Sequence, residues 1–486
     1  MKTFHIRSSE DAVTEKALAR LTKVPANSVL MVVRSGILAR TLPVAINTIP
    51  VTINQDLRAF VPEQGMDPKF LAWQLIADER EILNGCAKDG TTVASIEGPA
   101  LSAYPLKVAP AGEQERIVEK LEELLSDLDA GVAELKAAQR KLAQYRQSLL
   151  KAAVDGTLTA DWRAAHGAPQ ETGAELLQRI LTERRARWEQ TQLARFAEQG
   201  KRPPKGWQAK YKEPAAPSSS NHLSIPEMWA WTGIEQLAGG TPHALKAGPF
   251  GSALKKQFYT STGYKVYGQE QVIRGDAHFG DYFIPEEKFR ELIACAIQPG
   301  DLLISLVGTT GRILVLPEDA LPGIINPRLL KISLSPGNVR PEYVQIVLES
   351  PYARQFFKLN AHGGTMDVLN LGILKELAVP LPGLLEQEEI VRKIYAEFEL
   401  VEQQESAISR ALKHSAAQRK NLLRAAFTGQ LVPQDPNDEP ASGLLARIRT
   451  ERGQTARSRG ISGSNRAPAI CSSKPDRRRR KAKESA

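Results

Sequence analysis

The sequence repeats itself at an offset of 273 residues, and this duplication constrains the fold more than any single motif does. The segment EQERIVEKL, which starts at Glu113, resembles EQEEIVRKI, which starts at Glu386. SLLKAAVDGTL from Ser148 resembles NLLRAAFTGQL from Asn421 at the same offset. Because the two matches share one offset, the segment between them has the same length in both copies. The chain is therefore predicted to contain two copies of one structural unit.

The repeat extends further in both directions when shifts of a few residues are allowed. The additional matches are PANSVLMVV from Pro25 with PGDLLISLV from Pro299, Asn54 with Asn326, Gly90-Thr91 with Gly364-Thr365, and AELLQRILTER from Ala174 with SGLLARIRTER from Ser442. FHIRSSEDAV from Phe4 aligns best with YFIPEEKFRE from Tyr282, so the first copy has nothing that matches residues 223–280. We expect the first domain to lack its opening strands, because the true start lies upstream or because the domain is degraded.

Each copy contains a long segment in which hydrophobic residues recur at spacings of mostly four and three. They are Leu121, Leu125, Leu128, Val132, Leu135, Leu142 and Leu149 in the first copy, and Ile394, Phe398, Val401, Ile408, Leu412 and Leu422 in the second. This spacing predicts a coiled-coil seam on a helix of about 40 residues, roughly 60 Å long. Gly156 and Gly429 are predicted to stop the helices. Two equal seams favour pairing with each other; the alternative is a separate coiled coil in each copy that joins two molecules.

The segment before the second long helix is predicted to be a mixed α/β domain over residues 223–383. Short β-rich runs alternate with turn signals over residues 299–334, and residues 341–359 have a helical apolar stripe. Trp229 and Trp231 mark the start of this domain, after a Pro- and Ser-rich stretch. Between the copies we expect a helix over 174–199, followed by an extended, solvated connector.

The net charge of +9 belongs to the end of the chain alone. Residues 452–486 hold 11 basic and 2 acidic side chains, so the 53 basic and 53 acidic side chains of residues 1–451 balance. This tail is rich in Gly, Ser, Pro and Arg and is predicted to be disordered. Its Arg477–Arg480 cluster would attract DNA without regard to sequence. Net charge therefore indicates nothing about the folded part.

The sequence contains none of the catalytic motifs that we sought. There is no phosphate-binding G-x-x-x-x-G-K-[ST], no H-E-x-x-H and no G-x-S-x-G. His362 is interpreted as a structural turn residue. Cys86, Cys295 and Cys471 are too far apart in the sequence to suggest a zinc site or a disulfide framework. No apolar run is long enough to span a membrane, and we expect neither a cofactor nor export from a reducing cytoplasm.

Several of these motifs together resemble the specificity subunit of type I restriction-modification enzymes. They are LPGLLEQEEIV at 381–391, VAPAGEQERIV at 108–118, AAFTGQL at 425–431, IPEMWAW at 225–231 and GPFGSALK at 248–255. The resemblance covers nearly the whole chain, from Phe4 to about Arg452. It implies an α/β (α+β) fold with two target-recognition domains separated by two long helices that form an antiparallel coiled coil. In that family each domain reads one half of a bipartite DNA site, and the subunit has no active site.

The resemblance implies six segments and three kinds of partner. The segments are a shortened first target-recognition domain (1–110), the first spacer helix (111–160), a basic helix and linker (161–222), the second target-recognition domain (223–383), the second spacer helix (384–432) and a C-terminal segment with a disordered basic tail (433–486). The partners are double-stranded DNA and the methylation and restriction subunits of the same system. The alternative is a degraded remnant that binds methylation subunits but no longer reads a full site; a third interpretation is an enzyme with an unrecognised site.

Candidate DNA-binding residues are chosen from the glycine-containing loops by their side-chain chemistry. Lysine and arginine suit phosphates, glutamine suits adenine edges, and threonine can contact either. The candidates are Lys246, Lys255, Lys256, Lys265, Gln269, Gln271 and Arg274 around the first loop, Thr309, Thr310 and Arg312 in the second loop, and Arg34 as a rough counterpart in the first domain. A solvated charge remains an open alternative for each.

Overall fold

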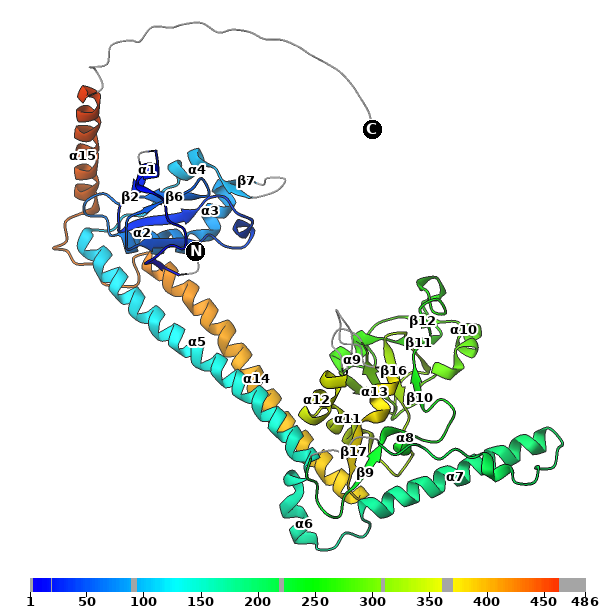
Figure 1. Cartoon of the computed structure of the whole chain (residues 1–486). Coiled ribbons are helices and arrows are strands. Elements are labelled where there is room, and N and C mark those ends of the chain that lie inside the picture. The colour runs from blue at the N-terminus through cyan, green and yellow to red at the C-terminus, as the bar shows by residue number, and fades with distance from the viewer. Residues whose placement is uncertain are drawn as a thin grey trace, which may run out of the picture. The chain divides into compact units, whose positions relative to one another are not determined.

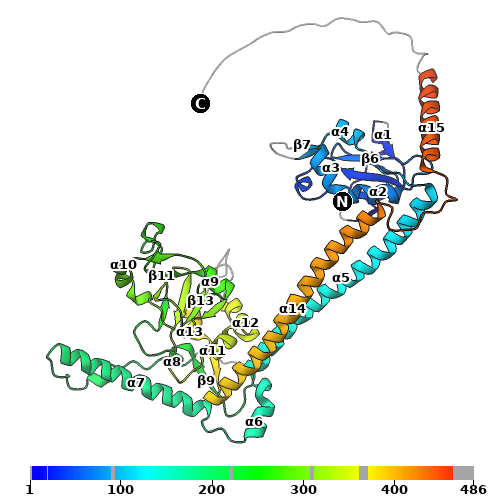
Figure 2. The ribbon, with the colours of Figure 1, turned by 180° about the vertical axis from the view of Figure 1, so that it is seen from behind.

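The computed structural model describes residues 3–18, 20–88, 94–217, 223–306, 311–360 and 370–462, with side chains to 454. Contacts divide the chain into two compact units, Met1–Leu135 with Arg410–Ala486, and Lys136–Ser409. Figure 1 shows the elements of each unit, and Figure 2 shows them from behind. Within the described ranges, no helix has both the length and the apolar character needed to cross a bilayer.

The first unit is built on a four-stranded sheet. Its order is β1 (His5–Ile6), β4 (Val44–Asn47), β3 (Ser28–Val32) and β6 (Leu57–Phe60), with β1 parallel to β4 and the other neighbours antiparallel. The helices α2 (Pro68–Ala77) and α3 (Glu79–Cys86) bury Leu71, Leu75 and Ile82 against this sheet. The smaller elements are α1 (Glu15–Leu18), α4 (Gly98–Ala103), and the pairs β2 (Lys23–Val24) with β5 (Val51–Thr52) and β7 (Ala87–Lys88) with β8 (Ser95–Ile96).

The second unit has a larger set of strands. One sheet runs β10 (Leu245–Ala247), β16 (Leu329–Ile332), β13 (Leu302–Ser305) and β14 (Ile313–Val315), all antiparallel; another runs β12 (Phe283–Ile284), β11 (Tyr264–Tyr267) and β15 (Gly323–Ile325). Strand β17 (Ala378–Leu381) pairs antiparallel with β9 (Ala230–Gly233). The helices are α8 (Ile234–Leu237), α9 (Gln269–Arg274), α10 (Glu286–Glu291), α11 (Pro341–Glu349), α12 (Pro351–Asn360) and α13 (Leu371–Glu376). The apolar faces of α11 and β13 share one core.

The repeat in the sequence is a repeat in the structure. The order β4-β3-β6 of the first unit matches β14-β13-β16 of the second, and all these pairs are antiparallel. Asn54 and Asn326 each accept a hydrogen bond from the backbone N–H two residues on, at 3.1 and 2.9 Å. The alignment of these two asparagines is thus supported by a shared local turn.

The equivalence extends to a single buried side chain at the start of each long helix. Gln114 accepts from the Asp67 N–H at 2.9 Å and donates to the Ala109 carbonyl at 2.8 Å. Gln387 makes the same two bonds with Arg340 and Pro382, at 3.0 and 3.1 Å. Both amides are fully buried. Each links the residue before a helix that begins with proline (α2 or α11) to the backbone just before a long helix (α5 or α14).

The first unit differs from the second at its front, as the alignment predicts. Its described residues include no counterpart of β9, β10 or β11. Strand β1, which the alignment places opposite β12, pairs in parallel with β4 instead. The physical reason is the missing partner, because β12 pairs with β11 in the second unit. On the equivalent strand β14, no described strand pairs with the edge that β1 occupies on β4.

The two long helices are α5 (Ala111–Val154, 44 residues) and α14 (Leu384–Ala426, 43 residues). In the first unit Leu121 and Leu125 of α5 pack with Leu423 of α14, and Asp129 pairs with Arg419 at 2.5 Å. In the second unit the Tyr145 hydroxyl donates to Glu397 at 2.9 Å. Further along the chain, just past the end of α5, the Leu158 carbonyl accepts from Lys393 at 3.1 Å. In both units the residue number of the α14 partner falls as the chain advances along α5, so the two helices are antiparallel within each unit. All predicted seam residues are buried or half-buried; a knobs-into-holes supercoil stays a prediction.

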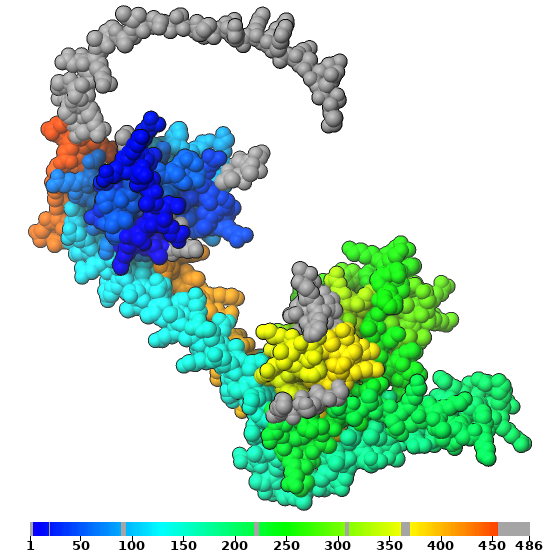
Figure 3. All heavy atoms as spheres, in the orientation of Figure 1, coloured from blue at the N-terminus to red at the C-terminus, as the bar shows by residue number. Residues whose placement is uncertain are grey.

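The connector between the repeats folds back on its own helix, which corrects the expectation of an extended, solvated linker. After α6 (Ala160–His166), α7 (Gly173–Glu198) projects from the rest of the second unit, as Figure 3 shows. Trp207 stacks on Trp188 of α7 at 5.7 Å between ring centroids, and Tyr211 lies at 5.3 Å from the same ring. These aromatic contacts hold the returning chain, and their burial explains why it does not stay extended.

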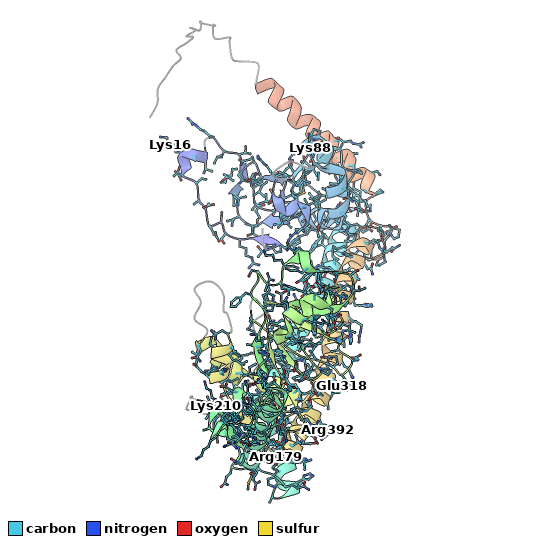
Figure 4. All side chains as sticks on the ribbon, turned by 90° about the vertical axis from the view of Figure 1, so that its right-hand side faces the viewer. Lys16, Lys88, Arg179, Lys210, Glu318 and Arg392 are labelled. Atoms are coloured by element: carbon cyan, nitrogen blue, oxygen red, sulfur yellow. The ribbon has the colours of Figure 1, made fainter. Side chains whose placement is uncertain are left out.

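The final helix begins within the C-terminal segment and continues into the predicted disordered tail. Helix α15 covers Ala441–Ser462, so residues 452–462 are helical and the prediction of disorder was wrong for them. Leu444 is fully buried, like Leu176 at the matching position of α7. The ion pairs Arg447–Glu439 and Arg179–Glu171 are also equivalent, both at 2.7 Å, and Figure 4 labels Arg179. The Arg477–Arg480 cluster lies outside the described residues.

Candidate nucleic-acid interface

Four loops of the second unit meet at one end of its sheets. Strands β10, β11, β13 and β15 end there, and β14 and β16 begin there, because the register pairs Ala247 with Leu330, Tyr267 with Ile325, and Ser305 with Leu329. The loops are 248–258, the start of α9, the two described ends of the 305–312 segment (305–306 and 311–312), and 326–328. Figure 1 shows α9 at the opposite end of this domain from β9 and β17. A cluster of loops at one sheet end offers a binding surface on a rigid base.

Hydrogen bonds and close backbone contacts fasten these loops to one another. The Gly248 N–H donates to the Leu329 carbonyl at 2.9 Å, and the Leu306 N–H donates to the Arg328 carbonyl at 3.0 Å. Gln269 donates to the Ser305 hydroxyl at 2.8 Å. A Cβ on Gly248 would lie 1.9 Å from the Asn326 carbonyl oxygen, so only glycine permits this approach. The loops are therefore held together by hydrogen bonds and form one continuous surface.

The exposed charged side chains at this end are mostly basic. They are Lys255, Lys256, Arg274, Arg312 and Arg328, with Glu270 as an exposed acid beside them. The domain over 223–383 holds 14 basic and 15 acidic residues, so a basic face can arise only by segregation of this kind. Positively charged side chains on loops that are held in place are suited to contact DNA phosphates.

Two predicted residues have structural roles that keep them from this surface. Lys265 on β11 is 2% exposed, and its ammonium donates to the His278 carbonyl at 2.7 Å. Burial lowers the pKa of Lys265, although Asp281 and Asp276 oppose the shift. Gln271 is 3% exposed, and its amide accepts from the Gly268 N–H and donates to the Phe279 carbonyl. Their proposed DNA contacts are therefore withdrawn: these side chains hold the ends of α9 and β11 in place.

The other predicted residues differ in how exposed they are and in where they lie. Lys246 is half-buried on β10, opposite Lys331, and Gln269 is half-buried at the start of α9. Arg274 is exposed, with its guanidinium 4.0 Å from the Phe279 ring. Thr309 and Thr310 lie outside the described residues. Arg34 is exposed at the equivalent end of the first unit, where it forms an isolated bridge with Ser95.

Two residues of this surface were missed by the sequence analysis. Phe250 is 90% exposed at the tip of the first loop, where its carbonyl accepts the turn hydrogen bond from Ala253. Arg328 follows the shared asparagine turn. The exposure of Phe250 could have been predicted from the sequence, because an aromatic residue between glycines in a polar loop does not usually reach the hydrophobic core. Arg328 could be found only once the turn at Asn326 was known to meet the 305–312 loop.

The equivalent end of the first unit is simpler and carries a different charge. The Val33 N–H donates to the Asp56 carbonyl at 2.8 Å, which matches the bond between Leu306 and Arg328. An acidic residue thus stands where the second unit has an arginine. The described residues of this unit include no counterpart of α9 or of the 248–258 loop. In the part of the chain that the structure describes, no cluster of three His, Cys, Asp or Glu could hold a metal ion.

Comparison with known proteins gives one consistent family. The sequence model described as "Type I restriction modification DNA specificity domain" matches residues 11–137 and 251–410. The EcoR124I/EcoR124II specificity subunit of Escherichia coli is 37% identical over 150 residues, which cover 30% of this chain and 37% of that protein. The Escherichia coli EcoBI specificity subunit is 25% identical over 372 residues, covering 74% of this chain and 67% of that protein.

A solved structure gives the same fold. It comes from a study of complex assembly and conformational transition in the type I R-M system, and the two chains superpose with a TM-score of 0.56. The sequences are 15% identical, and the match covers 84% of this chain and 83% of the other.

Proposed function

The chain belongs to the type I restriction modification DNA specificity family, and from this membership we propose that it recognises a bipartite DNA target and directs methylation and restriction subunits to it. The observation that carries the proposal is the duplicated unit, with its equivalent sheets and equivalent buried glutamines. Two related modules in one chain suit a target made of two short sequences at a fixed spacing.

In this proposal the loop end of the second unit contacts DNA. Lys255, Lys256 and Arg328 bind phosphates and set the position of the domain on the duplex. Arg312 and Gln269 are suited to base edges, since arginine pairs with guanine and glutamine with adenine in the major groove. Phe250 adds an apolar contact, either against a thymine methyl group or between base steps.

The chain itself supplies recognition and no chemistry in this proposal, and it acts in the cytoplasm, where its DNA and partner subunits are found. Methylation and restriction then belong to the subunits that it binds. The long helices α5 and α14 offer those subunits an extended surface, because only one side of each helix is used in the seam. Double-stranded DNA and the methylation and restriction subunits are thus its partners.

A comparison of DNA methylation in host strains with and without this chain tests the proposal. We expect methylated adenines in one bipartite motif to appear only when the chain and its methylation subunits are both present. An R312A/R328A double variant is expected to reduce this methylation, while Arg290→Ala, an exposed arginine on α10 beyond the opposite end of β11, serves as a control for loss of a basic residue away from the surface. Methylation that is unchanged when the whole chain is absent would contradict the proposal.

A second candidate function follows from the simpler first unit. That unit lacks counterparts of two of the four loops among its described residues and has Asp56 in place of Arg328. These differences favour a scaffold that binds methylation subunits and reads only one half-site. DNA-binding selection from random duplexes distinguishes the two: a motif in two parts supports full recognition, and a single short motif supports the scaffold.

A further inference from the structure

In the second unit, a buried carboxylate anchors the segment that opens the domain. Glu386 is 6% exposed and accepts hydrogen bonds from the Trp229 indole at 2.8 Å and the Thr159 hydroxyl at 2.7 Å. Arg163 also pairs with it. Trp229 directly precedes β9, so this contact places the strand that completes the edge of β17.

The first unit contains a carboxylate equivalent to Glu386, but its described residues do not supply the equivalent hydrogen-bond donors. Glu113, at the matching position of α5, is also 6% exposed. At an offset of 273 residues, Thr159 corresponds to Val432 and Arg163 to Pro436, neither of which has a side-chain donor. The described residues of the first unit include no counterpart of Trp229. Across the residues that the structure describes, no hydrogen bond reaches the Glu113 carboxylate, whose charged neighbour Arg116 pairs with Asp438 at 2.6 Å.

Among the residues that the structure describes, the strand edge beside this carboxylate also has no partner strand. Residues 105–108 correspond to β17, in which all four residues are buried. Leu106 is 40% exposed, whereas its counterpart Val379 is fully buried beneath β9. In the described structure no backbone hydrogen bond involves Leu106 or Val108.

The second unit shows which way the backbone N–H and C=O groups of Leu106 and Val108 point. Pro380 has no N–H, and its carbonyl accepts from the Tyr343 hydroxyl at 2.7 Å, so the main-chain bonds to β9 come from Val379 and Leu381. The counterpart of Pro380 is Lys107; with the Gln74 amide assigned so that its oxygen faces the Lys107 N–H, that N–H and the Lys107 carbonyl bond to Gln74 at 2.6 and 3.0 Å. The groups of Leu106 and Val108 therefore face the side that β9 fills in the second unit.

We propose that residues 105–108 and Glu113 form a docking site for an extended polypeptide segment of the Pro-x-x-Trp-x-Trp type. The segment adds a strand along Leu106 and Val108, and its first tryptophan donates its indole N–H to Glu113. The occupant is specified by residues 226–231, which bind the equivalent groups in the second unit. Main-chain bonds supply affinity in such strand addition, and the buried indole supplies specificity.

A labelled peptide of residues 223–237 tests this site by fluorescence anisotropy with the full chain. We expect saturable binding that weakens by roughly tenfold or more when Trp229 of the peptide is replaced by Phe, because a hydrogen bond to a charged group is lost. In the Glu113→Leu chain, the same peptide change should have little effect, as in a double-mutant cycle. An equal loss in both chains would overturn the proposal.

Two exposed positions give a matched pair that does not depend on burial of Glu113. Leu106→Pro removes an N–H that faces the docking segment, and we expect it to weaken peptide binding at least tenfold. Lys107→Pro removes the N–H that faces Gln74 and introduces the residue found at Pro380, so peptide binding should persist. Equal binding to both variants would overturn the proposal. So would a chain that forms dimers without peptide and rejects it, because the occupant would then be a second copy.

Discussion

At the scale of single residues, position in the sheet decides what a polar side chain does. Lys265 and Lys256 are nine residues apart, yet one donates inside the domain and the other is exposed. Residue type and loop membership predicted both as DNA contacts. Sequence could not separate them, because the burial of Lys265 depends on the pairing of β11 with β15, which brings together segments more than 50 residues apart.

Phe250 and Lys256 should affect DNA binding in different ways. We expect Lys256→Ala to lower affinity and to reduce the slope of log K against log salt by about one, because a phosphate contact releases counterions. Phe250→Ala should lower affinity by about 1–3 kcal/mol without changing that slope, since an apolar contact with bases releases no ions. Titrations at several salt concentrations check both. A changed slope for Phe250→Ala would assign its effect to the backbone contacts instead.

Glu349 predicts a pH-dependent stability for the second unit. Burial raises the pKa of this carboxyl above its usual value, despite Arg312, Arg354 and Arg146 nearby. The folded state thus favours the protonated form, and the stability from this group is present below the usual pKa and lost as pH rises through the raised one. We expect Glu349→Gln to gain stability over the wild type at pH 7 but not at pH 4 in urea unfolding. Glu287→Gln, at an exposed position, is the control; an equal gain at both pH values would contradict the assignment.

At the scale of elements, the long helices and the central strands could be predicted well from the sequence. Alternating spacings of four and three located α5 and α14, because a two-helix seam repeats its contacts over many turns. The prediction failed for the connector, where Trp207 packs on Trp188 across a turn that carries no periodic signal. The pairing of β1 with β4 was not predicted, because it depends on a strand for which the described residues of the first unit include no counterpart.

The buried glutamines should contribute equally to the two units. Gln114→Ala and Gln387→Ala each remove two hydrogen bonds and leave a helix-start N–H without its acceptor. We expect each change to destabilise its own unit by roughly 1–3 kcal/mol. Hydrogen exchange resolved by segment measures this, and exposed Gln403→Ala is the control. Loss of protection in the other unit alone would contradict the equivalence.

At the scale of the whole molecule, the proposed function makes the length of the paired helices a determinant of the DNA target. A seven-residue insertion after both Leu135 and Ile408 preserves the seam, since seven residues are one repeat of the hydrophobic pattern. It adds about 10.5 Å to each helix, or about three base pairs at 3.4 Å per step. We expect the methylated motif to gain about three base pairs between its halves. Insertion into one helix alone should abolish methylation, and an unchanged motif would show that the helices do not set the spacing.

The first unit is assembled from both ends of the chain. Phe70 and Leu121 share a core with Leu423 and Phe427, and Arg452 pairs with Glu63 at 2.9 Å. On the ribosome, residues 1–135 therefore leave the exit tunnel long before their core partners exist. At about 5–20 residues per second, the wait is on the order of 15–60 seconds. The second unit is contiguous in sequence and can fold meanwhile. The second unit is therefore synthesised completely before the first unit, although the synthesis of the first unit begins earlier.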